Sequence, residues 1–352
     1  MAEIVSVIIT ALNGAKWIDT CFKSILCQTA GSDKTLQIEV CVFDDASTDN
    51  TRELLQRWKT ILERSGMWMK IVGGNSDQPK GVGYGRNYAI KYATGSYLCF
   101  QDIDDEMLPD RISKQYQMAK NNQDAIIGSK FIRTPPNSTC RFTRWANELD
   151  PGKLDIQIYT TNGPTVIMPT WFCHRKVFDR VGAFCEDGKG TPEDLIFFYK
   201  HLDFGGRILR VDEVLLNYAY HENATTFSIS KEIIWKIRLE RLIQKILRTD
   251  LWKHGFTIWN AGKQGRRFFR DLPDDCKSFV RAFCDVDENK INTNYEYFDE
   301  VKRKVLYTVP IIHFKTAEKP IVVCMKLDLT NGVFEENLKS MNLIEGLDYV
   351  IF

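Results

Sequence analysis

The first hundred residues alternate short apolar runs with longer segments whose apolar residues recur at helical spacing. The strand-like runs are residues 5–9, 38–43, 70–72 and 97–100. In the segment after the first run, Trp17, Cys21 and Ile25 are spaced as on one face of a helix. Strands that alternate with helices favour a mostly parallel sheet, because parallel strands need crossover connections. The sequence therefore predicts an α/β fold for this part of the chain.

Acidic residues directly follow two of these runs. Asp44-Asp45 follows the second run, and Asp102-Ile-Asp104-Asp105 follows the fourth. Because parallel strands end at one edge of a sheet, where open α/β folds bind ligands, we expect both groups to open on one site. Neighbouring carboxylates repel one another unless a cation neutralises them, and Mg²⁺ is commonly shared between carboxylates and substrate phosphates. A helix-capping turn before Pro109 explains the second group equally well on its own.

Length and composition set the general class. A chain of 352 residues is longer than a typical single core, so we expect two domains. The sequence starts with Met1-Ala-Glu-Ile, which lacks the features of a secretory signal. No run contains the roughly 18 apolar residues that a membrane span requires. The ten cysteines include no C-x-x-C pair, which argues against a zinc site. We therefore expect a cytoplasmic location and no membrane contact.

Three more motifs carry reactive or ligand-binding side chains. Gly81-Val-Gly83-Tyr-Gly85-Arg86-Asn87 leads into a helix-like segment, whose N-terminal N–H groups can face an anion. Glu193-Asp194 opens a second helix-like segment, and His221 ends a strand-like run. The acidic pair can also be a helix cap, and a hydrogen-bonded histidine at a strand end is as common as a metal ligand.

In this order and separation, the motifs resemble glycosyltransferase family 2, the inverting enzymes with the GT-A fold. The resemblance covers roughly residues 4–222 and implies a nucleotide-sugar donor and a divalent metal, Mn²⁺ or Mg²⁺. For the donor, it implies that Thr10, Asn13 and Asp45 contact the uracil and ribose of a UDP-sugar and that Arg86 and Asp102 are further contacts. For the metal, it implies Asp102 and Asp104 as ligands, with His221 as a possible third. For catalysis, it implies Asp194 as the general base, with Glu193 as the second choice.

The second half has its own strand-like start at Phe256-Thr-Ile-Trp259. Asn260-Ala-Gly262-Lys-Gln-Gly265 follows, which is a dinucleotide-binding fingerprint with Asn in the first glycine position, and Asp285 ends the next strand-like run. Because of this departure we expect a Rossmann-like accessory domain that is structural or acceptor-binding and does not hold a dinucleotide. The predicted parts are residues 1–230 for the GT-A domain, 231–253 for a basic linking helix and 254–352 for the accessory domain.

Positive charge is concentrated between Lys231 and Arg270. This stretch contains eleven Lys or Arg and three acids, a net charge of +8 in a chain whose total is +1. A solvated amphipathic helix is the common explanation, and its apolar face would carry Ile233, Ile237, Leu242, Ile246 and Leu247. A contact surface for a polyanion such as RNA is the other explanation.

A narrower resemblance covers nearly the whole chain and favours the polyanion. It is carried by residues 142–145, 162–173, 256–267 and 282–291, which are similar to galactosyltransferases that modify tRNA. It implies transfer of galactose from UDP-galactose to the queuosine base of a tRNA, and the candidate tRNA contacts are Lys263, Arg266, Arg267 and Arg270. Two other hypotheses stay open: a UDP-N-acetylglucosamine transferase acting on a glycan, and a non-catalytic protein that binds tRNA or a nucleotide sugar.

Overall fold

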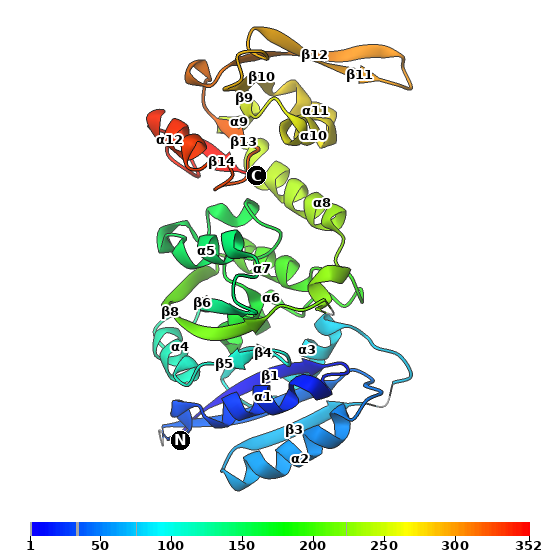
Figure 1. Cartoon of the computed structure of the whole chain (residues 1–352), viewed down its shortest axis with the longest axis vertical. Coiled ribbons are helices and arrows are strands. Elements are labelled where there is room, and N and C mark those ends of the chain that lie inside the picture. The colour runs from blue at the N-terminus through cyan, green and yellow to red at the C-terminus, as the bar shows by residue number, and fades with distance from the viewer. Residues whose placement is uncertain (1, 33–34, 75, 223) are drawn as a thin grey trace. The chain divides into compact units, whose positions relative to one another are not determined.

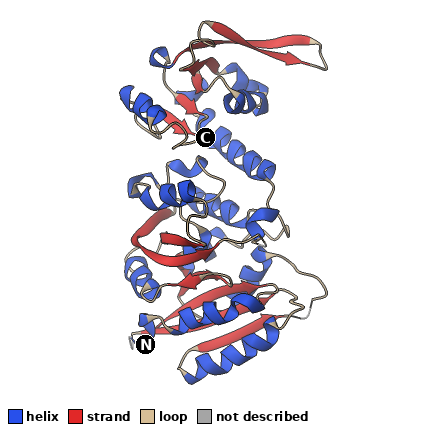
Figure 2. Ribbon diagram, in the orientation of Figure 1, coloured by secondary structure: helices blue, strands red, loops and turns tan. Residues whose placement is uncertain are grey.

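The computed structural model describes the chain except residues 1, 33–34, 75 and 223. Two compact units make up the chain. Unit 1 contains Met1–Asp155 and Gly163–Ile233, and unit 2 contains Ile156–Asn162 and Ile234–Phe352. Each unit has a sheet flanked by helices (Figure 1, Figure 2). The predicted fold class, a GT-A-like α/β domain followed by a second α/β domain, is confirmed.

Unit 1 is built on an eight-stranded sheet in the order β3-β2-β1-β4-β7-β6-β8-β5. Its strands are β1 (Glu3–Ala11), β2 (Leu36–Asp44), β3 (Trp68–Gly73), β4 (Tyr97–Asp102), β5 (Glu106–Met107), β6 (Ala125–Thr134), β7 (Phe172–His174) and β8 (Arg207–Ala219). The four predicted runs lie in β1 to β4, which are parallel to one another. The short strand β7 is antiparallel to β4 and β6, so the sheet is mostly but not entirely parallel.

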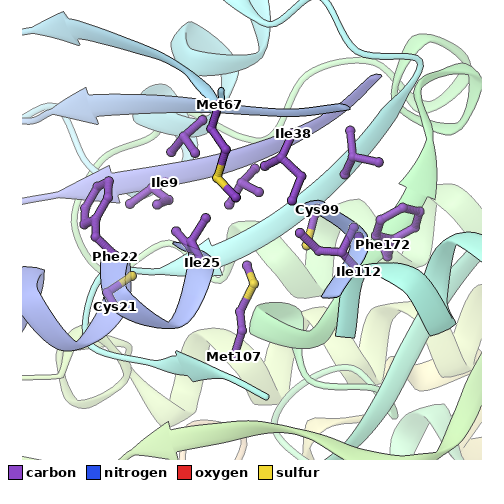
Figure 3. Packing of buried hydrophobic residues seen from close by; sticks show 14 of the residues in the cluster. Ile9, Cys21, Phe22, Ile25, Ile38, Met67, Cys99, Met107, Ile112 and Phe172 are labelled. Carbon is purple, nitrogen blue, oxygen red and sulfur yellow. The ribbon is translucent and has the colours of Figure 1, made fainter. Parts of the chain in front are cut away.

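The helices of unit 1 cover this sheet. They are α1 (Ala15–Leu26), α2 (Thr51–Arg64), α3 (Val82–Tyr92), α4 (Arg111–Ala119), α5 (Cys140–Glu148), α6 (Arg175–Val181) and α7 (Glu193–Asp203). Helix α1 buries Ile18, Phe22 and Ile25 in one cluster with residues of β1 and β2. Figure 3 shows Phe22 and Ile25 together with Ile9 and Ile38. Fully burying each such side chain contributes about 1.5–3 kcal/mol, so this cluster fixes α1 firmly on the sheet.

The strand register brings the predicted site residues to one edge. Thr10 on β1 lies opposite Phe43 on β2 and opposite Asp102 on β4. The loop that carries Asn13, the pair at Asp44 and the acidic turn after Asp102 therefore leave the sheet side by side, as the sequence predicts.

Unit 2 is a six-stranded sheet in the order β11-β12-β10-β9-β13-β14. Its strands are β9 (Phe256–Trp259), β10 (Val280–Asp285), β11 (Thr293–Asp299), β12 (Lys304–His313), β13 (Ile321–Val323) and β14 (Tyr349–Ile351), and its helices are α8 (Lys231–Leu242), α9 (Asp250–Lys253), α10 (Lys263–Asp271), α11 (Asp274–Ser278) and α12 (Val333–Ser340). Later strands are added on both sides of β9, and only β11 is antiparallel, which is the doubly wound, Rossmann-like arrangement.

The basic segment differs from the predicted linking helix. Helix α8 belongs to unit 2 from Ile234 onward, and Ile233, assigned to the apolar face, is 43% exposed. The buried face instead contains Arg238, whose guanidinium lies 4.7 Å from the Phe352 ring and donates to the Tyr159 carbonyl oxygen. Leu242 and Leu247 of the predicted apolar face are buried. Because a ring and a carbonyl accommodate its charge, Arg238 is buried on the same helix.

Residues 156–162 also pack with unit 2, although both flanking segments lie in unit 1. They include the short 3₁₀ helix η3 (Gln157–Tyr159), which lies against β14. None of the helices in the described part of the chain has the length and apolar character that crossing a membrane would take.

Candidate active site

The acidic turn after β4 gathers three carboxylates. Oxygens of Asp102, Asp104 and Asp105 lie within 4.8 Å of one another. Asp105 is 1% exposed; its Oδ1 accepts a hydrogen bond from the Ala219 backbone N–H at 2.9 Å, and its Oδ2 has no partner in the described part of the chain. Burial and the neighbouring negative charges raise the pKa of Asp104 and of Asp105. A divalent cation would relieve both effects, so this donor set fits Mn²⁺ or Mg²⁺.

His221 reaches the same turn from the end of β8. Its Nε2 lies 2.8 Å from Oδ2 of Asp104, and its ring stacks on the indole of Trp17 in α1. The sequence left His221 open between a metal ligand and a structural histidine. The structure places its ring nitrogen at one of the predicted metal ligands, within reach of a shared cation.

Arg86 in α3 connects the acidic turn to the start of α7. It is 5% exposed, its Nη2 lies 3.1 Å from Oδ1 of Asp102, and its Nη1 donates to Oε1 of Glu193. The predicted role was a donor contact. In this structure Arg86 is an internal link, because its guanidinium pairs with a predicted metal ligand and with one of the two candidate bases.

This link separates the roles of the two carboxylates at the start of α7. Arg86 pairs with Glu193, whereas within the described part of the chain Asp194 accepts a hydrogen bond only from the adjacent Leu195 N–H, at 2.7 Å. Burial, together with the charge of Glu193, raises the pKa of Asp194 to about 7, although Arg86 lowers it. A carboxylate with a pKa near neutrality suits a general base. The geometry therefore favours Asp194 over Glu193.

The three residues predicted to hold uracil and ribose also shape the loops around them. Asn13 Oδ1 accepts from the Thr48 N–H at 2.8 Å, which ties the β1–α1 loop to the β2–α2 loop. Both oxygens of Asp45 accept backbone hydrogen bonds, from Lys80 at 2.7 Å and Gly81 at 2.9 Å. Thr10 lies on β1 beside α3. Asn13 and Asp45 thus hold together the loops that follow β1, β2 and β3. Their direct contact with a nucleotide stays a prediction.

Two residues at the acidic cluster were missed as site residues. Trp17 was assigned to the apolar stripe of a helix, but its ring lies on His221. Asp105 was noted only as part of the acidic run, yet it is the buried member, and its Oδ2 has no hydrogen-bond partner among the described residues. Spacing could not reveal either role, since the partner of Trp17 lies some two hundred residues away in the sequence.

The glycine-rich loop of unit 2 is satisfied by its own side chains. The Ala261 N–H donates to Asp285 Oδ2 at 2.9 Å, and the Gly262 N–H donates to Asn260 Oδ1 at 2.7 Å. A Cβ on Gly265 would lie 1.9 Å from the Asn260 carbonyl oxygen, so this glycine permits close packing of α10 on β9. These N–H groups would face a phosphate in a dinucleotide site, and the structure favours the structural interpretation of the loop.

The four predicted tRNA contacts fall into two pairs. Lys263 and Arg270 are exposed. Arg266 donates from Nε to the Ala261 carbonyl at 2.8 Å, and Arg267 lies 4.1 Å from the Trp235 ring. The second pair takes part in packing within unit 2, so the exposed pair is the more accessible to a polyanion.

Comparisons with known proteins agree with this geometry. The family described as Glycosyl transferase family 2 matches residues 6–182. The uncharacterized glycosyltransferase EpsJ of Bacillus subtilis is 25% identical over 253 residues, which cover 70% of this chain and 68% of EpsJ. The poly(ribitol-phosphate) beta-glucosyltransferase of Bacillus spizizenii is 30% identical over 164 residues, 46% of this chain and 24% of that protein.

Among solved structures, S. aureus TarS 1-349 in complex with UDP-GlcNAc superimposes with a TM-score of 0.52 at 20% identity. The match covers 71% of this chain and 68% of that chain. The likeness is one of fold.

Proposed function

This chain belongs to glycosyl transferase family 2, and from that premise we propose that it is a metal-dependent, inverting galactosyltransferase that moves galactose from UDP-galactose onto the queuosine base of a cytosolic tRNA. The catalytic part rests mainly on one observation. A single buried guanidinium, that of Arg86, pairs with Asp102 of the acidic turn and with Glu193 beside Asp194. One side chain thus connects the acidic cluster proposed to bind the metal with the helix start that carries Asp194, whose pKa is near 7.

The proposed reaction is a single displacement at the anomeric carbon. A queuosine hydroxyl oxygen bonds to that carbon while the bond to the diphosphate oxygen breaks, and UDP leaves with the bonding electrons. Asp194 accepts the hydroxyl proton on the face opposite the diphosphate. Asp102, Asp104 and His221 would hold the divalent cation, which when bound neutralises the charge that develops on the diphosphate. The Arg86 ion pair keeps Glu193 from competing for the proton.

Charge and sequence motifs support the tRNA acceptor. Exposed cations in and after α8 include Lys231, Lys236, Lys263 and Arg270. Neutralising RNA phosphates releases their counterions, so such residues supply salt-dependent affinity. The resemblance of residues 142–145 and 162–173 to tRNA-modifying galactosyltransferases supplies the choice of queuosine and galactose.

The direct test is a transfer assay on tRNA that carries queuosine. The purified protein with UDP-galactose and Mn²⁺ or Mg²⁺ should add the mass of one hexose to queuosine, detected by mass spectrometry of the digested tRNA. Asp104→Ala should abolish transfer, and Asp194→Asn should slow it by about 10²–10⁴-fold. If the wild-type protein leaves this tRNA unmodified, the acceptor assignment is wrong. A protein that binds UDP or tRNA but never turns over would support the non-catalytic alternative.

A second candidate is a UDP-N-acetylglucosamine transferase acting on a glycan or polyol-phosphate acceptor. The name of one similar protein, a poly(ribitol-phosphate) beta-glucosyltransferase, supports an acceptor of this kind, and TarS was solved with UDP-GlcNAc. Running both donors in the same assay separates the two proposals, because each predicts turnover with its own nucleotide sugar.

A further inference from the structure

Trp17 contacts the ring of His221, which is a candidate ligand of the metal site. The two ring centroids lie 4.9 Å apart with an interplanar angle of 27°, which is a stacked arrangement. The Nε2 atom of the same imidazole lies 2.8 Å from Oδ2 of Asp104. One residue of α1 therefore contacts the ring that approaches the acidic turn from β8.

Two other residues in or next to α1 also lie close to the acidic turn. A Cβ on Gly14 would lie 3.1 Å from Cγ1 of Ile103, and Sγ of Cys21 lies 3.8 Å from the Asp102 carbonyl oxygen. Trp17 lies between these two contacts along the helix and is outside the buried cluster that holds α1 on the sheet. Its indole is half-buried, so the core does not need it in order to pack.

The imidazole has little else to fix its rotation. Nε2 makes the contact to Asp104, and no hydrogen bond to Nδ1 of His221 is found among the residues that the structure describes. The second torsion of a histidine side chain has broad minima, so an unsupported ring turns easily. Metal-binding histidines are usually oriented by an outer partner. Here Trp17 orients the imidazole in another way, by stacking on the face of the ring.

We propose that Trp17 is a positioning residue that keeps Nε2 of His221 directed at Asp104 and thereby presets the divalent-metal site. The inference rests on the proposed function, because it requires a cation at Asp102 and Asp104. Stacking limits rotation of the imidazole, so the side chain loses less conformational entropy when the cation binds. Without the indole, the ring samples orientations in which Nε2 faces away from the cluster.

The test measures Mn²⁺ binding to the full chain in the presence of UDP, from the electron paramagnetic resonance signal of free Mn²⁺. Trp17→Leu removes the ring but keeps an apolar side chain, and we expect Mn²⁺ binding to weaken about tenfold. Trp17→Phe keeps a ring and should bind within about twofold of the wild type. His221→Asn should weaken binding by itself, and adding Trp17→Leu to it should cause no further loss.

Two matched controls separate positioning from general damage. Trp68→Leu removes a 48%-exposed tryptophan on β3 and should leave Mn²⁺ binding unchanged. Lys16→Gln removes the ammonium that lies 4.3 Å from the Trp17 ring while keeping the indole, and should also bind normally. If Trp17→Leu does not fold, as judged by thermal melting, Trp17→Met gives the same comparison.

The outcomes distinguish this inference from the proposed function. If the wild-type protein binds no Mn²⁺, the metal-dependent reaction fails and the inference fails with it. If the wild type binds Mn²⁺ but Trp17→Leu binds it equally well, only the inference is wrong. A loss from Trp17→Leu that persists in full in the His221→Asn background also overturns it, because Trp17 would then act by another route.

Discussion

Glu193 and Asp194 are adjacent in the sequence, yet their surroundings differ. Arg86 pairs with the first, and the second keeps a raised pKa. Sequence reasoning found both residues, because a Glu-Asp pair at a helix start is part of the family pattern. It preferred Asp194 only through the family resemblance, since the partner that distinguishes the two lies on α3, more than a hundred residues earlier in the chain. The choice depends on tertiary contact, which adjacent letters do not encode.

The first prediction concerns the pH dependence of transfer. The base must be ionised, so kcat/KM should fall as the pH is lowered through about 7, the pKa of Asp194. Glu193→Gln removes a charge that raises this pKa, so the falling limb should move to lower pH. A pH–rate series on both proteins checks this. An unshifted limb in Glu193→Gln would mean that another group titrates.

The second prediction concerns stability at Arg86. Arg86→Ala leaves the buried Glu193 without its cation, and removing one partner of a buried pair costs about 3–5 kcal/mol in the free energy of unfolding. Urea unfolding measures the loss. The control is Arg57→Ala, whose pair with Asp19 is exposed on both sides and should cost about 0–1 kcal/mol. Equal losses in the two variants would contradict an internal role for Arg86.

At the scale of elements, the long strands and helices around the nucleotide edge follow from the sequence. Their β-branched runs and helical spacing predict β1 to β4 and the intervening helices. The shorter pieces do not follow: β5 has two residues and β7 has three, too few to show a period. The apolar face of the basic segment was predicted only in part: Leu242 and Leu247 are buried, but Ile233 is exposed. Arg238 is buried, although a count of apolar residues places it in solvent.

The third prediction tests the close approach of α3 to the segment that contains Cys185. A Cβ on Gly83 would lie 2.0 Å from the Cys185 carbonyl oxygen, which is backbone and cannot turn aside. Gly83→Ala should therefore force α3 outward, lower the free energy of unfolding by about 1–3 kcal/mol, and reduce transfer because Arg86 lies on the same helix. Gly163→Ala, at a position with open space, is the matched control for urea unfolding and activity. If Gly83→Ala unfolds at the same urea concentration as the wild type, the close contact does not constrain α3 and the prediction is wrong.

At the scale of the whole chain, the sequence predicts a first α/β domain that ends at residue 230, a linking helix over residues 231–253 and a second α/β domain from residue 254. The division falls within α8, and a seven-residue segment of the first half packs with the second unit. Neither feature has a composition signal, because both depend on which apolar faces meet after folding.

The fourth prediction concerns acceptor binding by unit 2. Lys263→Glu combined with Arg270→Glu should weaken tRNA binding and lessen its dependence on salt, and should leave UDP binding unchanged. Filter binding or fluorescence anisotropy at several salt concentrations measures this. Lys91→Glu, an exposed lysine on α3, is the control for a change in net charge. Unchanged tRNA affinity in the double variant would return the basic stretch to an ordinary solvated surface.

The packing of residues 156–162 with unit 2 has a consequence for the synthesis of the protein. Ile158 and Tyr159 are 6% and 4% exposed, and their segment packs against β14, the final strand described. The ribosome makes β14 after β1 to β13, so these two apolar side chains wait for their partner while about 190 further residues are synthesised. A truncated protein that stops at residue 230 would carry them permanently uncovered, and chaperone dependence or aggregation is the expected result.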